Sequence, residues 1–159
     1  MIGLLRGKYI GGEGSQTLIY TGGVGYSVET SERFRGRVKI GQSVTLFVHT
    51  NLREGALELF GFESLWEKRV FYMLTSVSGI GPKTALTALG SVSAEYIINA
   101  IIKEDRHALT AMSGVGKKTA ERILVELKEK AHILFKEKNL VTVDTGQLEI
   151  DKNEVLPVF

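Results

Sequence analysis

Two near-identical glycine-lysine segments constrain the fold of this chain more than any other feature of its sequence. The first reads Leu-Thr-Ser-Val-Ser-Gly-Ile-Gly-Pro-Lys-Thr-Ala over residues 74–85, and the second reads Leu-Thr-Ala-Met-Ser-Gly-Val-Gly-Lys-Lys-Thr-Ala over residues 109–120. The copies lie 35 residues apart, and apolar residues at helical spacing precede and follow each one. The sequence therefore predicts two successive pairs of helices, each pair joined by a tight glycine turn.

The residue types in these turns suit the binding of phosphate by the backbone. Glycine lets a backbone approach a ligand closely, and the helix that follows directs free N–H groups and a positive dipole end at an anion. Lysine in a first helical turn opposes that dipole, so folding alone gives no reason for it. We therefore predict two helix-hairpin-helix motifs that bind DNA through these residues: Gly79, Ile80, Gly81, Lys83, Thr84, Gly114, Val115, Gly116, Lys117, Lys118 and Thr119. Two ordinary glycine-capped helix connections are the alternative.

Charge and composition agree with a polyanionic partner for the middle of the chain. Residues 64–138 carry 12 basic against 8 acidic side chains, whereas residues 1–63 carry 7 against 6 and residues 139–159 carry 1 against 4. The chain lacks cysteine, a secretory signal at its start and any apolar run of membrane-spanning length. We expect a cytoplasmic protein with no membrane contact.

Residues 1–63 are predicted to form a small β-barrel of the OB type. Short runs of β-branched and aromatic residues alternate there with glycine turns, and Gly22–Gly25 is expected to form a tight, bulged hairpin. Five such runs in about sixty residues suit a small closed barrel. The expected strands are 2–10, 17–20, 24–30, 44–50 and 57–62.

Residues 64–138 are predicted to be helical, which makes the expected fold α+β, an OB-type barrel followed by an all-α domain. Ser93 and Asp105 are placed to cap helices, Pro82 suits a first helical position, and a long helix is expected to start near Lys117. Residues 139–159 are expected to be an acidic linker or tail.

The order of these parts resembles the RuvA family, the junction-binding subunits of bacterial branch migration. The resemblance rests on residues 1–7, 22–26, 59–62 and 117–122 and covers residues 1 to about 138. It implies a non-catalytic homotetramer, or two stacked tetramers, that binds four-way DNA junctions. We expect no cofactor and no metal-ligand cluster, and the sequence leaves open a monovalent cation held by the carbonyls of the hairpin turns. The resemblance also implies that Lys83, Lys117, Lys118 and Arg122 grip phosphates and that the ATPase RuvB is a partner.

Two departures from the family pattern affect those expectations. Family members carry two adjacent carboxylates, an acidic pin, on a hairpin tip, whereas this chain has Glu54 flanked by Arg53 and Gly55. Gly55 is equally explained as a turn residue. The resemblance also implies a third, RuvB-contacting domain, and the sequence to Phe159 has no room for one. That argues against direct contact between this polypeptide and RuvB.

The same residues leave two other functions open, and exclude a third. A DNA glycosylase would use an aspartate after the hairpin, and Asp144 is the candidate, although it lies 26 residues beyond Lys118. A general tandem-hairpin module would bind duplex and junction about equally. An ATPase phosphate loop is excluded, because a Walker A motif needs glycine at Ala111 and Ser or Thr at Lys118. The three histidines are too scattered to suggest a metal site.

Overall fold

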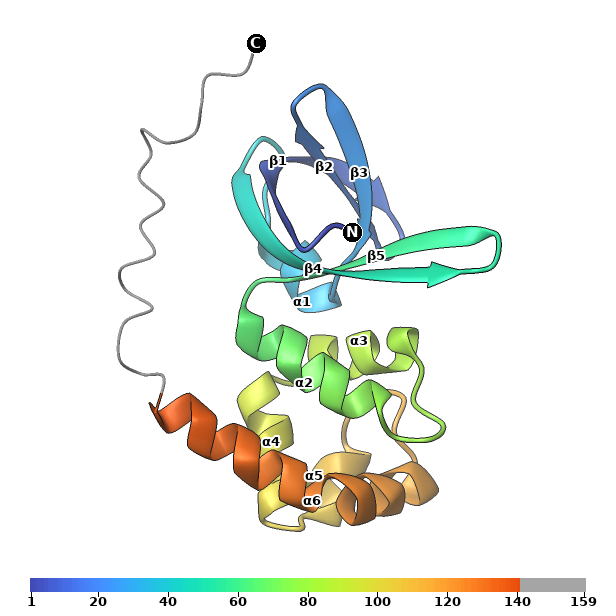
Figure 1. The fold of residues 1–159 in the computed structure, drawn as a ribbon, viewed down its shortest axis with the longest axis vertical. Helices are drawn as coiled ribbons and strands as arrows, with labels where there is room; N and C mark the ends of the chain where they lie inside the picture. The colour runs from blue at the N-terminus through green and yellow to red at the C-terminus, as the bar shows by residue number, and fades with distance from the viewer. Residues whose placement is uncertain (141–159) are drawn as a thin grey trace.

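The computed structural model describes residues 1–140, in which a five-stranded barrel lies above a group of helices (Figure 1). The strands alternate buried and exposed side chains, as expected for a sheet that encloses a core. All five predicted strands are present, with shifts of a few residues at their ends. Their bounds are β1 Leu4–Glu13, β2 Gln16–Thr21, β3 Val24–Glu29, β4 Ser43–Arg53 and β5 Ala56–Phe62.

The barrel closes in the order β1-β2-β3-β5-β4, with β4 returning to pair with β1. All pairings are antiparallel except that of β3 with β5. The predicted tight hairpin at Gly22–Gly23 is confirmed, but the predicted bulge there is wrong, because the β2–β3 register is unbroken up to Thr21 opposite Val24. The register shift lies in β1 instead, between Tyr9 and Gly12, where Gly11 has a φ of 113°.

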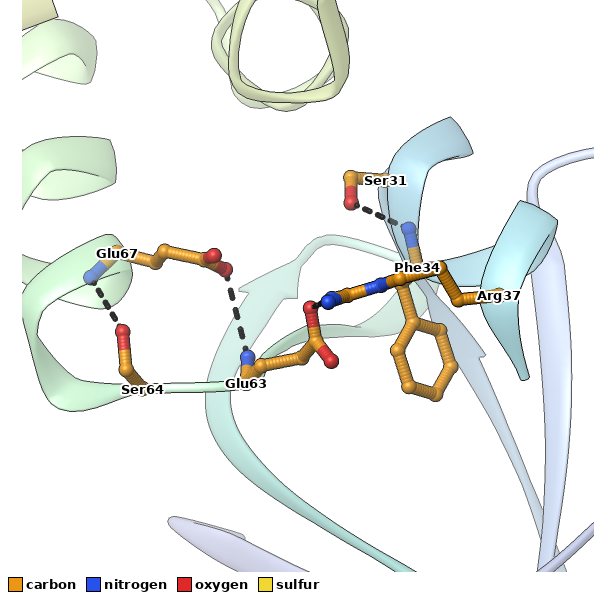
Figure 2. A network of polar contacts seen from close by, with 6 residues as sticks. All are labelled: Ser31, Phe34, Arg37, Glu63, Ser64 and Glu67. Carbon is orange, nitrogen blue, oxygen red and sulfur yellow. Dashed lines mark hydrogen bonds and ion pairs between the residues drawn. The ribbon is translucent and has the colours of Figure 1, made fainter. Parts of the chain in front are cut away.

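A short helix, α1 (Glu32–Arg37), connects β3 to β4 and was not predicted from the sequence. Ser31 caps it by accepting a hydrogen bond from the backbone N–H of Phe34 at 3.2 Å. Arg37 at its end forms an ion pair with Glu63, which lies in the connection from β5 to α2 (Figure 2). This contact ties the barrel helix to the point where the chain leaves the barrel.

Five further helices follow the barrel, and the predicted caps are confirmed. Ser93 accepts from the N–H of Tyr96 at 3.1 Å, and Asp105 accepts from the N–H of Ala108 at 3.0 Å. Pro82 occupies the start of its helix as expected. The bounds are α2 Leu65–Thr75, α3 Pro82–Ser91, α4 Ala94–Ile102, α5 Arg106–Thr110 and α6 Lys117–Leu140. The tail is predicted to begin at residue 139, but Asn139 and Leu140 still belong to α6. The rest of the predicted tail, with Asp144, lies outside the described residues.

The start of α2 carries its own cap next to the barrel. Ser64 accepts from the N–H of Glu67 at 3.1 Å, and the Glu67 carboxylate accepts from the N–H of Glu63 at 3.4 Å (Figure 2). Burial, together with the nearby Glu63 carboxylate, raises the pKa of Glu67. The cap therefore orients α2 with respect to the last strand of the barrel.

The molecule has two hydrophobic clusters, one inside the barrel and one among the helices, and the helical cluster includes side chains of the barrel. The barrel cluster includes Ile19, Val28 and Leu46, whereas Phe60 and Phe62 of β5 belong to the cluster formed by the helices. The barrel and helices are thus joined by shared core side chains. Within residues 1–140 no single helix has the length and apolar character needed to cross a membrane. In the same residues, one pair of helices, α3 and α4, has that length and apolar character when taken together, but the pair is bent by 97°.

Trp66, on α2, is partly buried against the helical core. The ammonium group of Lys138, near the end of α6, lies 4.5 Å from the centre of its ring. Lys138 also forms an ion pair of 2.8 Å with Glu95 of α4. The last turns of α6 are thus fixed against two other helices.

Candidate nucleic-acid interface

The two predicted hairpins have the same local structure. In the first, the N–H of Ile80 donates to the carbonyl of Val77 at 3.1 Å; in the second, Val115 donates to Met112 at 3.2 Å. Each helix then begins with an equivalent bond, Ala85 to Gly81 at 3.0 Å and Ala120 to Gly116 at 2.9 Å. Every partner is displaced by 35 residues, so the repeat in the sequence is a repeat in the backbone.

Ile80 and Val115, the residues between the glycines, turn their side chains inward. Ile80 is 5% exposed and Val115 is 7% exposed, and both belong to the helical core. Burial of these side chains fixes each loop against its two helices. The two backbones are held in place by packing, while their outer surfaces stay open.

The first glycine of each turn is required by the fold. Gly79 and Gly114 have φ values of 92° and 84°, in the left-handed region that disfavours residues with a side chain. A Cβ on Gly79 would lie 3.1 Å from the Arg122 guanidinium, and one on Gly114 would lie 3.2 Å from the methyl group of Thr84. Both conformation and crowding therefore select glycine here.

The second glycine of each turn is not required by any contact of this kind. A Cβ built on Gly81 or Gly116 would meet no atom of the described part of the chain within 4 Å. Gly81 has an extended backbone, with φ −85° and ψ 172°, that any residue can adopt. It precedes α3 without a side-chain cap, whereas α1, α2, α4 and α5 all have one. The chain leaves open space beside free backbone N–H groups at this position.

The predicted lysines lie at the N-terminal ends of these helices. Lys83 is in the first turn of α3, and Lys117 and Lys118 are in the first turn of α6; all three are exposed. Neither first turn contains an acidic residue. Among residues 1–140 no carboxylate lies within 4 Å of these three ammonium groups. Their charge adds to the helix dipole and makes both sites favourable to an anion.

The remaining predicted residues connect the two hairpins. Thr84 of α3 packs its methyl group toward Gly114 of the second hairpin. Arg122 of α6 donates from Nη1 to the carbonyl of Ser78 in the first hairpin at 3.2 Å. Ser113 donates its N–H to the hydroxyl of Ser91 at 3.2 Å. Thr119 is half-buried in the first turn of α6.

One basic residue near the first loop was absent from the prediction. The Lys130 ammonium group lies 3.5 Å from the hydroxyl of Ser76, at the end of α2. Its spacing from the apolar residues of α6 places Lys130 on the outer, charged face of that helix. Only the packing of α6 along α2 brings it to the loop.

The hairpin of β4 and β5 projects from the barrel on the same side of Figure 1 as the α2–α3 loop and the start of α6. Its tip is a two-residue turn of Glu54 and Gly55, with Arg53 paired to Ala56 and a φ of 74° at Gly55. Glu54 is exposed. Arg53 is neutralised by Glu58, 2.8 Å away, so Glu54 contributes the unbalanced charge of the tip. Gly55 has the conformation of a turn residue.

The projecting hairpin has two different faces. Asn51 and Arg53 both contact the Glu58 carboxylate, which makes one face polar and hydrogen-bonded. Leu52 and Leu57 are directly paired on the other face and are 79% and 62% exposed.

Residues 1–140 contain no group of three or more His, Asp or Glu side chains that could hold a metal ion. The three histidines are separate. His49 is half-buried against aromatic rings, and His107 and His132 are exposed on helices. The described residues therefore contribute backbone N–H groups and cations to the candidate interface.

Comparison with known proteins agrees with this division of the chain. Residues 1–61 match the family described as RuvA N terminal domain, and residues 71–129 match the SAM-like Helix-hairpin-helix tandem. The two matches coincide with the barrel and with the paired hairpins. They confirm the predicted fold class, an OB-like barrel followed by a helical tandem-hairpin region.

Several similar proteins are named Holliday junction branch migration complex subunit RuvA. The protein from Acinetobacter baumannii (strain SDF) is 40% identical over 130 residues, which are 82% of this chain and 65% of that protein. The one from Halothermothrix orenii is 44% identical over 130 residues, covering 82% and 66%. The chain thus spans slightly less than two thirds of the length of these relatives.

A longer match is found with the protein of that name from Acinetobacter baylyi. It is 37% identical over 154 residues, which are 96% of this chain and 77% of the relative. The similarity therefore runs through both the barrel and the hairpins rather than being confined to either. From the two domain matches and this extended identity, we conclude that the chain belongs to the RuvA family.

Proposed function

We propose that this chain binds four-way DNA junctions as a non-catalytic subunit, holding them open for branch migration. The observation that carries the proposal is the unoccupied space at Gly81 and Gly116. Each glycine stands at the start of a helix, beside exposed lysines that have no carboxylate partner within residues 1–140, and the arrangement occurs twice. A DNA phosphate fits the chemistry of both sites, because it supplies the negative charge and the acceptor oxygens that these groups lack.

Binding of this kind depends on DNA shape. Backbone N–H groups and lysines contact phosphate oxygens, which are the same for every base sequence. Two hairpins 35 residues apart contact phosphates at a fixed separation, so they select a backbone path. A four-way junction differs from linear duplex in that path, and this difference is what the chain is proposed to recognise.

The proposed assembly is a homotetramer on one face of the junction, or two tetramers that enclose it. Relatives are named as subunits of a branch migration complex, which supports assembly with further proteins. We carry over from the family the ATPase RuvB as the motor and the cytoplasm as the location. Direct contact of residues 1–159 with RuvB is not part of the proposal.

In the proposed tetramer, the Glu54 tips act as an acidic pin. One exposed carboxylate per chain, with its neighbour Arg53 neutralised by Glu58, supplies four negative charges to the assembly. Those charges would repel phosphates and favour separated strands where the duplex arms meet. A two-carboxylate pin would supply eight, so this chain is proposed to restrain branch migration less than relatives that have one.

The proposal is tested by titrating the chain against a four-way junction and a linear duplex of the same arm sequence. The titration should be made near 150 mM salt, because weak phosphate binding is exaggerated at low ionic strength. Junction preference of tenfold or more, in a complex sized for four or eight chains, supports the proposal. Equal affinity in a complex sized for one chain would leave a general tandem-hairpin module and would remove the pin and tetramer.

A further inference from the structure

The projecting β4–β5 hairpin carries the inward-facing row of the barrel out beyond the barrel core. Side chains two residues apart lie on the same face of a strand. On β4, Leu52 therefore shares the face of Val48, which is buried in the barrel core. On β5, Leu57 shares the face of Leu59, which is buried there too. Leu52 and Leu57 lie directly opposite each other and are largely exposed, so the apolar pattern continues where there is no core to receive it.

The barrel closes before it reaches this leucine pair. The hydroxyl of Thr50 donates to the carbonyl of Ile2 at 2.8 Å and accepts from the N–H of Ile2 at 3.0 Å, which fixes the start of the chain across the end of the barrel. Strand β5 pairs with β3 at Phe60. Beyond Thr50 and Phe60 the hairpin has no neighbouring strand within residues 1–140. The two leucines therefore lie on an arm that no described part of the chain covers.

The opposite face of the arm is already satisfied by its own contacts. The Glu58 carboxylate accepts from Nδ2 of Asn51 at 3.2 Å and pairs with Nη2 of Arg53 at 2.8 Å. These three polar groups are neighbours across the two strands and stabilise the hairpin without outside help. Of the two faces, the leucine face is thus the one that a binding partner would cover.

The size of the leucine face suits a nucleobase better than a protein. Burial of two leucines removes on the order of 200 Å² of apolar surface, whereas each partner in a specific protein complex buries about 800 Å². The face ends at the exposed carboxylate of Glu54 on one side and at the hydrogen-bonded Thr50 on the other. An apolar patch this small matches the faces of one or two bases, and apolar side chains in other DNA-binding proteins do insert at single base steps.

The Glu54 carboxylate determines which part of a DNA molecule can approach the leucines. It repels phosphates, so DNA close to the tip presents bases to the arm rather than backbone. The arm projects on the same side as the α2–α3 loop and the start of α6, where phosphates are proposed to bind (Figure 1). DNA held by the two glycine turns would thus have its bases, and not its phosphates, beside Leu52 and Leu57.

We propose that Leu52 and Leu57 form an apolar contact for the faces of unstacked bases at the point where the arms of a four-way junction meet. This inference rests on the proposed function, because DNA bound by the glycine turns is what brings the crossover to the arm. It gives the tip two complementary actions. Glu54 keeps phosphates apart, and the leucines stabilise the bases that this separation exposes.

The test compares two double variants of nearly the same shape, Leu52→Val with Leu57→Val and Leu52→Thr with Leu57→Thr. Valine and threonine are both β-branched and favour strands, so both variants keep the hairpin. They differ in a hydroxyl, which is buried without a partner when it is pressed against a base face. The threonine variant is therefore expected to bind a four-way junction about tenfold more weakly than the valine variant. Affinity for linear duplex should be the same for both.

Two further readouts identify the contact as one with bases. A fluorescent base analogue at the crossover, which brightens when it is unstacked, should brighten less with the threonine variant than with the valine variant. The slope of log affinity against log salt should be equal for the two, because no phosphate contact is lost. Ile40→Thr changes another exposed apolar side chain of the barrel domain and should behave as the unmodified chain does. Equal junction affinity and equal brightening in the valine and threonine variants would overturn the inference.

Another copy of the chain is the competing occupant of the leucine face, and sedimentation velocity without DNA tests it. Both variants are expected to sediment as the unmodified chain does. A smaller assembly in the threonine variant would place the leucines between subunits and remove the base contact.

Failure of this inference can be told from failure of the proposed function. If the unmodified chain shows no junction preference, the proposed function fails, and a duplex with a short bubble of unpaired bases then tests the leucines. The valine variant should prefer the bubble to full duplex, and the threonine variant should not. Equal binding of both duplexes by the valine variant would refute the base contact. If junction preference is normal and the two variants agree, the function stands and the base contact does not.

Discussion

The Nδ1 atom of His49 lies 2.8 Å from the phenolic oxygen of Tyr72, which hydrogen-bonds strand β4 of the barrel to helix α2. The imidazole also lies 5.7 Å, centre to centre, from the ring of Phe71 and 6.3 Å from that of Phe60. Burial among these rings, and secondarily the positive charge of Lys68, lowers the pKa of His49. A titratable group thus lies where the two domains of the chain meet.

Acidification is expected to weaken the contact between the barrel and the helices. Because the pKa of His49 is lower in the folded chain than the ordinary 6.5, the unfolded chain binds the proton more readily. The stability due to neutral His49 is complete above pH 6.5 and is lost as the pH falls through the folded-state pKa. Thermal unfolding from pH 8 to pH 5 should show a shallower decline in His49→Gln than in the unmodified chain.

His132→Gln is the control for that titration, because His132 is exposed on α6. Its decline with pH should match that of the unmodified chain. Identical pH profiles for His49→Gln and the unmodified chain would show that His49 does not make the stability of the chain depend on pH.

Alanine substitution of the first glycine of each turn is expected to lower stability, whereas substitution of the second is expected to lower junction affinity. Gly114→Ala should destabilise the chain by about 1–2 kcal/mol, because its φ of 84° is left-handed. Gly116→Ala should change stability by less than about 1 kcal/mol, since the methyl group meets nothing within 4 Å and alanine lowers the entropy of the unfolded chain. It should nonetheless weaken junction binding about tenfold, because the methyl group takes up space proposed for phosphate.

Urea unfolding and junction titration of the same preparations separate these two effects. The pair Gly79→Ala and Gly81→Ala repeats the comparison in the first hairpin. If Gly116→Ala and Gly81→Ala bind junctions as well as the unmodified chain, the open space at the second glycines is not a phosphate site.

The lysines at the two helix starts are expected to act through charge alone. Lys83→Ala or Lys118→Ala should weaken binding to the same degree for junctions of different base sequence. Each should also lower the slope of log affinity against log salt by roughly 0.9 for each lost phosphate contact. Lys128→Ala should leave the slope nearly unchanged, because this lysine is paired with Glu104. An unaltered slope and affinity in both variants would refute their role.

Removal of the charge at the hairpin tip is expected to help binding. Glu54→Gln should bind a four-way junction as tightly as the unmodified chain or more tightly, because a carboxylate near phosphates is repulsive. It should also change the separation of strands at the crossover, which fluorescent base analogues placed there would report. Glu13→Gln, an equal change in charge at the exposed end of β1, controls for net charge. Weaker binding by Glu54→Gln than by Glu13→Gln argues against a repulsive pin.

Local signals explain why so much of the fold could be predicted. Ser93, Asp105 and Pro82 each act within three residues of their position in the sequence. Helix α1 has only six residues and includes a glycine, so it is too short to show helical periodicity. Its signals lie only at its ends: the cap at Ser31 with Glu32 in the first turn, and Arg35 and Arg37 in the last turn. The bulge in β1 depends on pairing with β2, which no single strand reveals.

In the candidate site, too, local sequence predicts some features and not others. Lys83, Lys117 and Lys118 are placed by their own helices, so their spacing alone predicts where they lie. The contact of Arg122 with Ser78 joins residues 44 positions apart and depends on how α6 crosses the first hairpin. No short segment of the sequence predicts tertiary packing of that kind.

The ring of Trp66, covered by Lys138, gives the molecule a built-in optical reporter. The chain has one tryptophan, so all indole emission comes from the place where α2, α4 and the last turns of α6 meet. Loosening of α6 there would move the ammonium group away and admit water to the indole, changing both the intensity and the colour of the emission. Events at the far end of the longest helix can therefore be followed without attaching a dye.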